Sequence, residues 1–155
     1  MVIFGIDPGL AKLGYGVIAY AGGDLRYLDA GVLTTPPSIP TSQRLAMLMD
    51  QLEKRCNHRK PARIVLERLF PGPHRNLGKV AEVRGVALLL AGRMNIPVLE
   101  TSPRAIKTLL TRYGGAEKMQ MRRTVQRLLR MPELPPADAA DALALAISGA
   151  GRLPL

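Results

Sequence analysis

The chain has 155 residues, of which 47% are hydrophobic, so it can form a single globular domain over residues 1–155 and is not a disordered polypeptide. The longest apolar run, Val86 to Ala91, is far too short to span a membrane, and no basic segment precedes the N-terminal apolar run as in a secretory signal. A single cysteine, Cys56, excludes an internal disulfide and predicts a cytoplasmic protein, while 22 Lys and Arg against 12 Asp and Glu give a net charge of +10 that favours nucleic-acid partners.

The first predicted element is a buried strand that ends in an acid. Residues 2–7 are apolar up to Asp7, and Pro8 with Gly9 ends the run. A carboxylate at the rim of a core is costly unless a cation, a substrate or a hydrogen-bond network meets it. Residues 14–20 form a second strand, which a hairpin signal at Gly22-Gly23-Asp24 connects to a third strand at residues 25–34.

A proline-rich loop over residues 35–40 leads into the first helix, and we expect Thr41 to cap it. This helix carries one apolar stripe that includes Cys56, which we expect in the core rather than in a metal site. Residues 64–67 then repeat the pattern of the first strand. They form a short apolar run, typical of a strand covered on both faces, and end in the carboxylate of Glu67.

The helix predicted for residues 77–94 is apolar on more than one side. Its apolar side chains are Val83, Ala87, Leu90 and Met94 on one stripe and Val86 and Leu89 on the other side. A helix that is apolar all round is buried on two sides. One side can face the sheet, and a second subunit is a good candidate for the other, so the pattern predicts a homodimer.

Three further elements follow in the C-terminal half. Residues 96–100 form a short strand, and Ser102 with Pro103 starts a helix as its cap and first residue. The next helix begins near Ala116, with Lys118 in its first turn at the edge of the apolar face. Its opposite face carries Arg123, Arg127 and Arg130. A solvated surface and a set of phosphate contacts are both consistent with these arginines.

The last predicted helix, residues 137–147, carries two acids on one face. Asp138 and Asp141 are three residues apart, and the segment is otherwise alanine and aliphatic, without a basic residue to neutralise them. An exposed, capping Asp138 beside a solvated Asp141 is the alternative. Charged residues are rarely buried without a partner, however, so acids in a helix of small apolar residues are more often functional.

Asp7, Glu67, Asp138 and Asp141 together predict a metal site. Hard divalent cations prefer oxygen ligands, and Mg²⁺ is held by a few carboxylates with water and substrate phosphate. Two such ions, Mg²⁺ or Mn²⁺, about 4 Å apart can activate a water and stabilise the leaving oxygen of a phosphodiester. Setting the four acids aside leaves 12 − 4 = 8 acidic against 22 basic residues. An acidic site in a basic chain is typical of a metal-dependent nuclease. No Cys/His cluster indicates zinc, and no glycine-rich phosphate loop is present.

Six motifs, in matching order and spacing over nearly the whole chain, resemble the RuvC family of Holliday-junction resolvases. They are Gly5-Ile6-Asp7-Pro8-Gly9, Gly14-Tyr15-Gly16-Val17, Glu67 followed by Phe70, Arg84-Gly85-Val86-Ala87, Ala116-Glu117-Lys118, and Ala137-Asp138-Ala139-Ala140-Asp141-Ala142-Leu143-Ala144. The resemblance implies an RNase H-like α/β fold, with a mixed five-stranded sheet and helices on both faces. It implies a homodimer that binds a four-way DNA junction, nicks two strands of like polarity, and associates with the RuvA and RuvB branch-migration proteins.

The resemblance also implies residue roles. The acidic tetrad of the family falls on Asp7, Glu67, Asp138 and Asp141, and some members carry His at the third position. Its functional lysines match Lys107 and Lys118, which would contact phosphate or stabilise developing charge. Phe70 matches an aromatic residue that would stack on an unpaired base at the crossover. Further candidates for DNA contact are His74, Arg75 and Lys79, although residues 71–75 are proline-rich, unlike other members, and a loop histidine is usually solvated.

Three other classes of function remain alternatives. An actin-like kinase or ATPase also opens with a strand and an acidic turn, but it needs a second similar domain for which 155 residues leave no room. A junction-binding protein without catalysis would not need the four acids. An RNase H-like nuclease with another nucleic-acid substrate would use the same metal chemistry, and it is the hardest class to distinguish from a junction nuclease.

Overall fold

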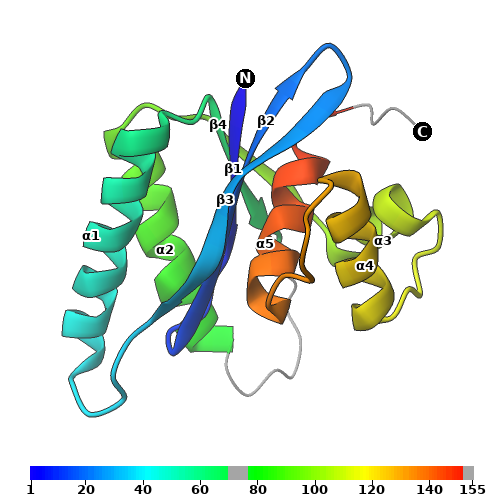
Figure 1. Cartoon of the computed structure of the whole chain (residues 1–155). Helices are drawn as coiled ribbons and strands as arrows, with labels where there is room; N and C mark the ends of the chain where they lie inside the picture. The colour runs from blue at the N-terminus through cyan, green and yellow to red at the C-terminus, as the bar shows by residue number, and fades with distance from the viewer. Residues whose placement is uncertain (70–76, 152–155) are drawn as a thin grey trace.

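A mixed five-stranded sheet forms the centre of the molecule, with helices on both faces (Figure 1). The computed structural model describes residues 1–69 and 77–151. The elements are β1 (Val2–Asp7), β2 (Lys12–Ala21), β3 (Asp24–Thr34), α1 (Thr41–Arg59), β4 (Arg63–Glu67), α2 (Leu77–Arg93), β5 (Val98–Thr101), α3 (Pro103–Thr111), α4 (Lys118–Leu128) and α5 (Ala137–Ser148). The strands lie in the order β3-β2-β1-β4-β5. β1, β2 and β3 pair antiparallel, whereas β1, β4 and β5 pair parallel. The predicted fold class is confirmed.

Successive side chains of a strand point to opposite faces of the sheet, and each face has its own core. Phe4 and Ile6 of β1 pack in the core that α1 and α2 cover, whereas Ile3 packs in the core formed with α3, α4 and α5. β4 follows the same rule, with Val65 on the α5 side. Asp7 is four residues after Ile3, and Glu67 is two residues after Val65. The alternation along each strand therefore directs both acids to the α5 side as well.

α5 lies unusually close to β1 and β2 because glycines face it. A Cβ atom added at Gly5 would lie 2.0 Å from the carbonyl oxygen of Ala142, and one at Gly14 would lie 2.1 Å from that of Asp138. A Cβ atom added at Gly16 would likewise lie 2.6 Å from the backbone nitrogen of Leu143. At these three positions the main chain of α5 thus rests directly on the main chain of the sheet.

Several element boundaries differ from those predicted. Thr41 is the first residue of α1, not its cap; Pro40 holds the cap position, and no side chain caps this end. The strand expected at residues 96–100 is shifted to Val98–Thr101, since Pro97 has no N–H to donate and its carbonyl accepts a bond from Ile64. The predicted cap at Ser102 is confirmed by its hydrogen bond from the Ala105 N–H.

The structure also locates Cys56 and the helix predicted to start near Ala116. The Cys56 side chain is fully buried in the core beneath α1, as expected for a residue that is not a metal ligand. Among residues 1–69 and 77–151, no helix has both the length and the apolar character that crossing a bilayer requires. The helix that starts near Ala116 begins at Lys118, with Glu117 as its cap residue.

Candidate active site

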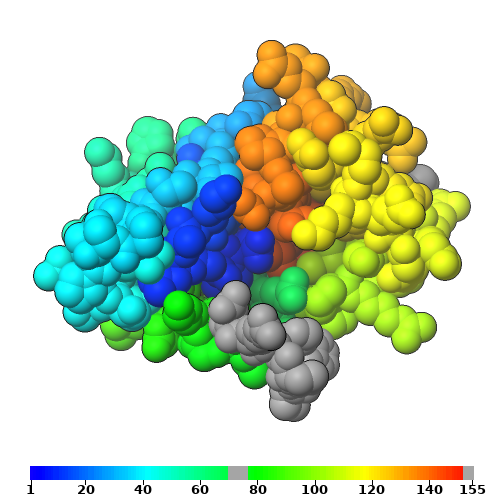
Figure 2. All heavy atoms as spheres, turned by 90° about the horizontal axis from the view of Figure 1, so that it is seen from below, coloured from blue at the N-terminus to red at the C-terminus, as the bar shows by residue number. Residues whose placement is uncertain are grey.

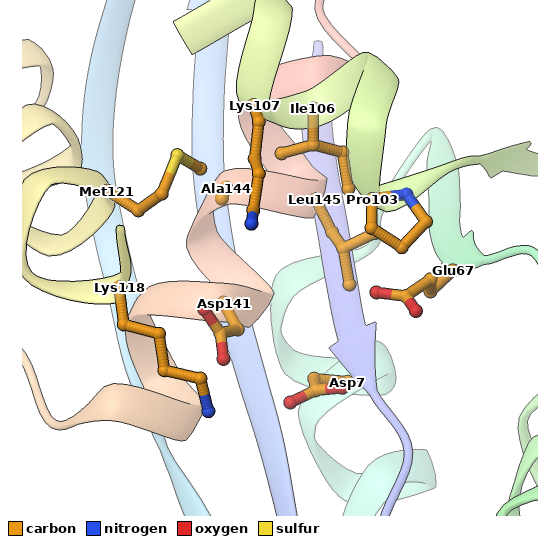
Figure 3. A pocket seen from close by; sticks show the side chains of 10 residues that line it. All are labelled: Asp7, Glu67, Pro103, Ile106, Lys107, Lys118, Met121, Asp141, Ala144 and Leu145. Carbon is orange, nitrogen blue, oxygen red and sulfur yellow. The ribbon is translucent and has the colours of Figure 1, made fainter. Parts of the chain in front are cut away.

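The acids gather at the end of the molecule where β1 terminates. Figure 2 looks onto this end, with the β1–β2 turn in blue beside the start of α5 in orange and α4 in yellow. A cavity of about 180 Å³ opens here (Figure 3). Its lining comprises three acids, Asp7, Glu67 and Asp141, two lysines, Lys107 and Lys118, and the apolar residues Pro103, Ile106, Met121, Ala144 and Leu145.

The parallel pairing of β1 with β4 brings two of the acids together. Ile6 is the register partner of Leu66, so Asp7 and Glu67 follow side by side at the carboxyl ends of neighbouring strands. The alternation of side chains directs both of them to the α5 face. Two short apolar strands that each end in an acid therefore deliver two carboxylates to one edge of the sheet.

The third acid of the cavity, Asp141, comes from α5, which the glycine contacts hold against the sheet. Asp138 lies one turn earlier and does not line the cavity. Its charge nevertheless contributes to raising the pKa of both Asp7 and Asp141, so it belongs to the same electrostatic cluster. Of the four predicted acids, three line the cavity and the fourth lies at its border.

Burial and mutual repulsion shift the titration of these acids. The pKa of Asp7 rises from 3.8 to about 7, chiefly because burial disfavours its charge and then because Asp141, Glu67 and Asp138 repel it. Burial also raises the pKa of Glu67 and Asp141, with repulsion from Asp141 adding to the shift of Glu67. Burial and repulsion together therefore make it unfavourable for all of these acids to be charged at once in the absence of a cation.

Two lysines extend into the cavity from the other side (Figure 3). Lys107 lies on α3, and Lys118 is the first residue of α4, with its side chain directed toward Asp7 and Asp141. Lys118 opposes the rise in the pKa of both acids. The structure thus brings together both predicted lysines and three predicted acids, which come from five elements.

The sequence model described as crossover junction endodeoxyribonuclease RuvC matches residues 3–149.

The chain belongs to the RuvC family.

Relatives in this family align over nearly their full lengths. RuvC of Thermomicrobium roseum is 45% identical over 151 residues, which are 95% of this chain and 91% of that protein. RuvC of Chloroflexus aggregans is 43% identical over 156 residues, 99% of this chain and 95% of that protein. The structure of Thermus thermophilus RuvC matches with a TM-score of 0.87 at 31% identity, covering 96% of this chain and 92% of that one. The same protein in complex with a Holliday junction substrate matches with a TM-score of 0.89 at the same identity and coverage. These matches confirm the RNase H-like fold.

Sequence reasoning missed one residue beside the RuvC-family site, Arg122. Its guanidinium donates two hydrogen bonds, of 3.0 and 2.8 Å, to the carbonyl of Pro135, just before α5 begins. It also lowers the pKa of Asp141 against the effect of burial. The sequence did contain a signal for this residue, because Arg122 lies four residues after Lys118 and so on the same face of α4.

The remaining predicted contacts lie apart from the cavity. Phe70, His74 and Arg75 fall outside the described residues. Lys79 does not line the acidic cavity but a second depression beside the β1–β2 turn. Arg123 and Arg127 lie on α4 away from the acids, and Arg130 follows the end of that helix.

The carboxylates of the cavity are the candidate ligands for divalent cations. In the described part of the chain, no group of three or more His, Cys, Asp or Glu side chains is arranged closely enough to hold a metal ion. The donor set nevertheless fits one chemically, because carboxylate oxygens are the ligands that hard divalent cations prefer. The causes of the raised pKa of Asp7 point the same way, since burial and then repulsion from Asp141, Glu67 and Asp138 are both effects that a bound cation would offset.

Proposed function

We propose that this RuvC-family protein resolves four-way DNA junctions by metal-dependent hydrolysis of phosphodiester bonds. The observation that carries the proposal is the convergence of Asp7, Glu67 and Asp141 with two lysines in one cavity of a protein with net charge +10. Family membership supports the substrate, because the related Thermus thermophilus RuvC is described in complex with a Holliday junction. We extend the proposal to paired nicks in strands of like polarity.

Each charged group in or beside the cavity has a proposed role. Two divalent ions, Mg²⁺ or Mn²⁺, bound by Asp7, Glu67, Asp138 and Asp141, would activate a water and stabilise the leaving oxygen. Asp7 must lose its proton to serve as a ligand, and its raised pKa makes this the most pH-sensitive step of assembly. Lys107 and Lys118 then bind the phosphate and stabilise its developing charge. The apolar wall formed by Ile106 and Met121, among others, keeps this chemistry away from bulk water.

The substrate assignment is tested by cleavage of a synthetic four-way junction beside a linear duplex and an RNA–DNA hybrid of the same sequence, in Mg²⁺ and in Mn²⁺. We expect paired, symmetrically placed nicks in the junction and slow or no cleavage of the other two. Preferred cleavage of the hybrid would favour an RNase H-like nuclease with another substrate and would contradict the proposal.

The close contact between α5 and the sheet leads to a prediction about Gly14. Gly14→Ala introduces a Cβ atom 2.1 Å from the Asp138 carbonyl oxygen, so α5 must move with both of its acids. Because misplacing a reacting group by ~1 Å can cost about 100-fold, we expect junction cleavage to fall by roughly that factor. Single-turnover nicking rates measure the effect. Gly92→Ala is the control, since a Cβ atom there meets nothing within 4 Å. Full activity in folded Gly14→Ala would contradict this account of the site.

We further propose that the protein acts as a homodimer through α2. Val83, Ala87 and Leu90 bury one side of this helix, yet Leu88 and Leu89 on the other side are 39% and 59% exposed. Exposed leucines next to each other on one helix are typical of a surface that a partner covers. A dimer would also supply two active sites for two nicks.

Association with RuvA and RuvB, and a single nuclease domain over residues 1–155, are proposed from the family resemblance.

The dimer proposal predicts that Leu89→Glu yields monomers. The exposed position tolerates a charge in the folded monomer, whereas burying that charge in an interface is strongly unfavourable. Sedimentation at micromolar concentration should show a dimer for the wild type and a monomer for the variant. Met119→Glu is the matched control, because Met119 is 43% exposed on α4, across the sheet from α2. A monomeric wild type would contradict the proposal.

A further inference from the structure

A second, cationic depression lies on the other side of the β1–β2 turn. It measures about 490 Å³ and has a lining of Gly9, Leu10, Ala11, Lys12, Pro37, Arg44, Lys79 and Val80. Three of these residues, Lys12, Arg44 and Lys79, are cationic, and no acid is among them. We call this depression the Arg44 pocket. Its charge is opposite to that of the cavity that holds Asp7.

Arg44 is the unusual member of the pocket, because it is only 9% exposed. Its Nε atom donates a 2.8 Å hydrogen bond to Thr35 Oγ1, and that hydroxyl donates to the Leu10 carbonyl. Neither of the two ion pairs among residues 1–69 and 77–151 involves Arg44. A buried guanidinium without a carboxylate partner is unfavourable unless another anion meets it. The Thr35 bond uses one of its five N–H groups, which leaves the fork of the guanidinium for a ligand.

The backbone around the pocket adds to its preference for anions. Lys79 and Val80 belong to the first turn of α2, where N–H groups without helical partners and the helix dipole favour negative charge. Lys12 and Lys79 are both exposed, so their ammonium groups are free to converge on a ligand at the rim. A buried guanidinium, two exposed ammonium groups and a helix N-terminus together suit one chemical class of ligand, the phosphate group.

The position of the pocket identifies the source of that phosphate. Gly9 is two residues after Asp7, so their Cα atoms are at most about 7 Å apart. In Figure 2 the start of α1 in cyan and the start of α2 in green flank the blue β1–β2 turn on the side away from α4 and α5. The Arg44 pocket is therefore close enough for a DNA strand with one phosphodiester at the acidic cavity to reach it within a few nucleotides.

We propose that the Arg44 pocket binds a backbone phosphate of the DNA strand that is cut, close to the scissile phosphodiester. The inference rests on the proposed function and deepens it. The acidic cavity repels the DNA backbone that it must cleave, and the pocket supplies an attractive contact immediately next to it. Arg44 also bonds, through Thr35, to the turn that follows Asp7, so the same residue connects the phosphate contact to the catalytic edge of the sheet.

The test measures binding of a fluorescent four-way junction over a series of salt concentrations, with EDTA present so that metal-dependent cleavage does not occur. Lys12→Gln with Lys79→Gln removes two exposed charges of the pocket without disturbing a core. Lys54→Gln with Arg26→Gln is the matched control, because these residues are also exposed and neither lines the pocket. Arg44→Gln is a third variant, with its melting temperature measured to verify folding.

We expect the pocket variants to weaken junction binding on the order of tenfold at ~0.1 M salt. The slope of log K against log salt concentration should become shallower by about 0.9 for each DNA phosphate that the variant no longer neutralises. The control pair should retain the wild-type slope. A wild-type slope in the Lys12/Lys79 variant would overturn the inference and leave the proposed function intact. Failure of the wild type to bind or cleave four-way junctions would overturn the proposed function itself, and with it this inference.

Discussion

Replacing Asp7 with Asn is expected to abolish junction cleavage while junction binding persists. Asp7 is the acid on which the charges of Glu67, Asp138 and Asp141 all act, so it lies at the electrostatic centre of the cluster. An amide cannot neutralise a divalent cation. Losing one of a few carboxylate ligands should therefore remove several kcal/mol of transition-state stabilisation, which corresponds to about three orders of magnitude in rate.

Single-turnover nicking in Mg²⁺ and Mn²⁺, together with equilibrium junction binding, measures this prediction. Asp50→Asn is the matched control, because Asp50 is an exposed aspartate on α1 and should retain the wild-type rate. Nicking by Asp7→Asn in either metal at a rate near that of the wild type would refute the catalytic assignment. Loss of binding together with loss of cleavage would refute the expectation that Asp7 acts in chemistry rather than in recognition.

The same substitution should stabilise the metal-free protein at neutral pH. The pKa of Asp7 is 3.8 in its ordinary state and about 7 in the folded protein. Below pH 3.8 both states hold the proton and Asp7 has no effect. Between these values the folded state keeps a proton that the unfolded state has released, so stability falls as the pH rises. Above about pH 7 the full penalty applies, at most on the order of 4 kcal/mol.

Thermal or denaturant unfolding in EDTA at pH 4 and pH 8 tests this expectation. The free energy of unfolding of Asp7→Asn minus that of the wild type should be near zero at pH 4 and clearly positive at pH 8. The difference between proteins is the useful quantity, because the net charge of +10 affects both equally as the pH changes. Adding Mg²⁺ at pH 8 should stabilise the wild type more than the variant. A difference independent of pH would show that Asp7 does not carry the raised pKa.

Local sequence patterns predicted the strands and their acids because the physics there is local. A short apolar run predicts a buried strand, and the carboxylate that ends the run predicts where the strand reaches the surface. Both β1 and β4 form as expected. The boundaries of elements are harder to predict where two neighbouring residues both suit the start of a helix. Thr41 and Pro40 both suit the start of α1, and in the structure Pro40, with an extended ψ of 148°, is the cap residue.

The arrangement of the candidate site depended on contacts that no local pattern contains. The spacing of Asp138 and Asp141 predicts a shared helix face, but not that Asp141 lines the cavity while Asp138 lies at its border. Arg44 was not singled out, because its isolation from carboxylates arises only when the chain is folded. Arg122 was likewise overlooked beside the more numerous arginines of α4, although its bonds to Pro135 hold the segment that leads into α5.

The glycines of β1 and β2 have a consequence for how the active site tolerates change. Because the main chains of α5 and the sheet touch at Gly5, Gly14 and Gly16, backbone contacts limit how closely the helix and the sheet approach beside the acids. We therefore expect residues of the core beneath α1 and α2 to vary in size with little effect on the separation between the β1 acid and the α5 acids. To change metal preference, replacing the acids themselves should therefore be a more direct route than repacking the core beneath α1 and α2.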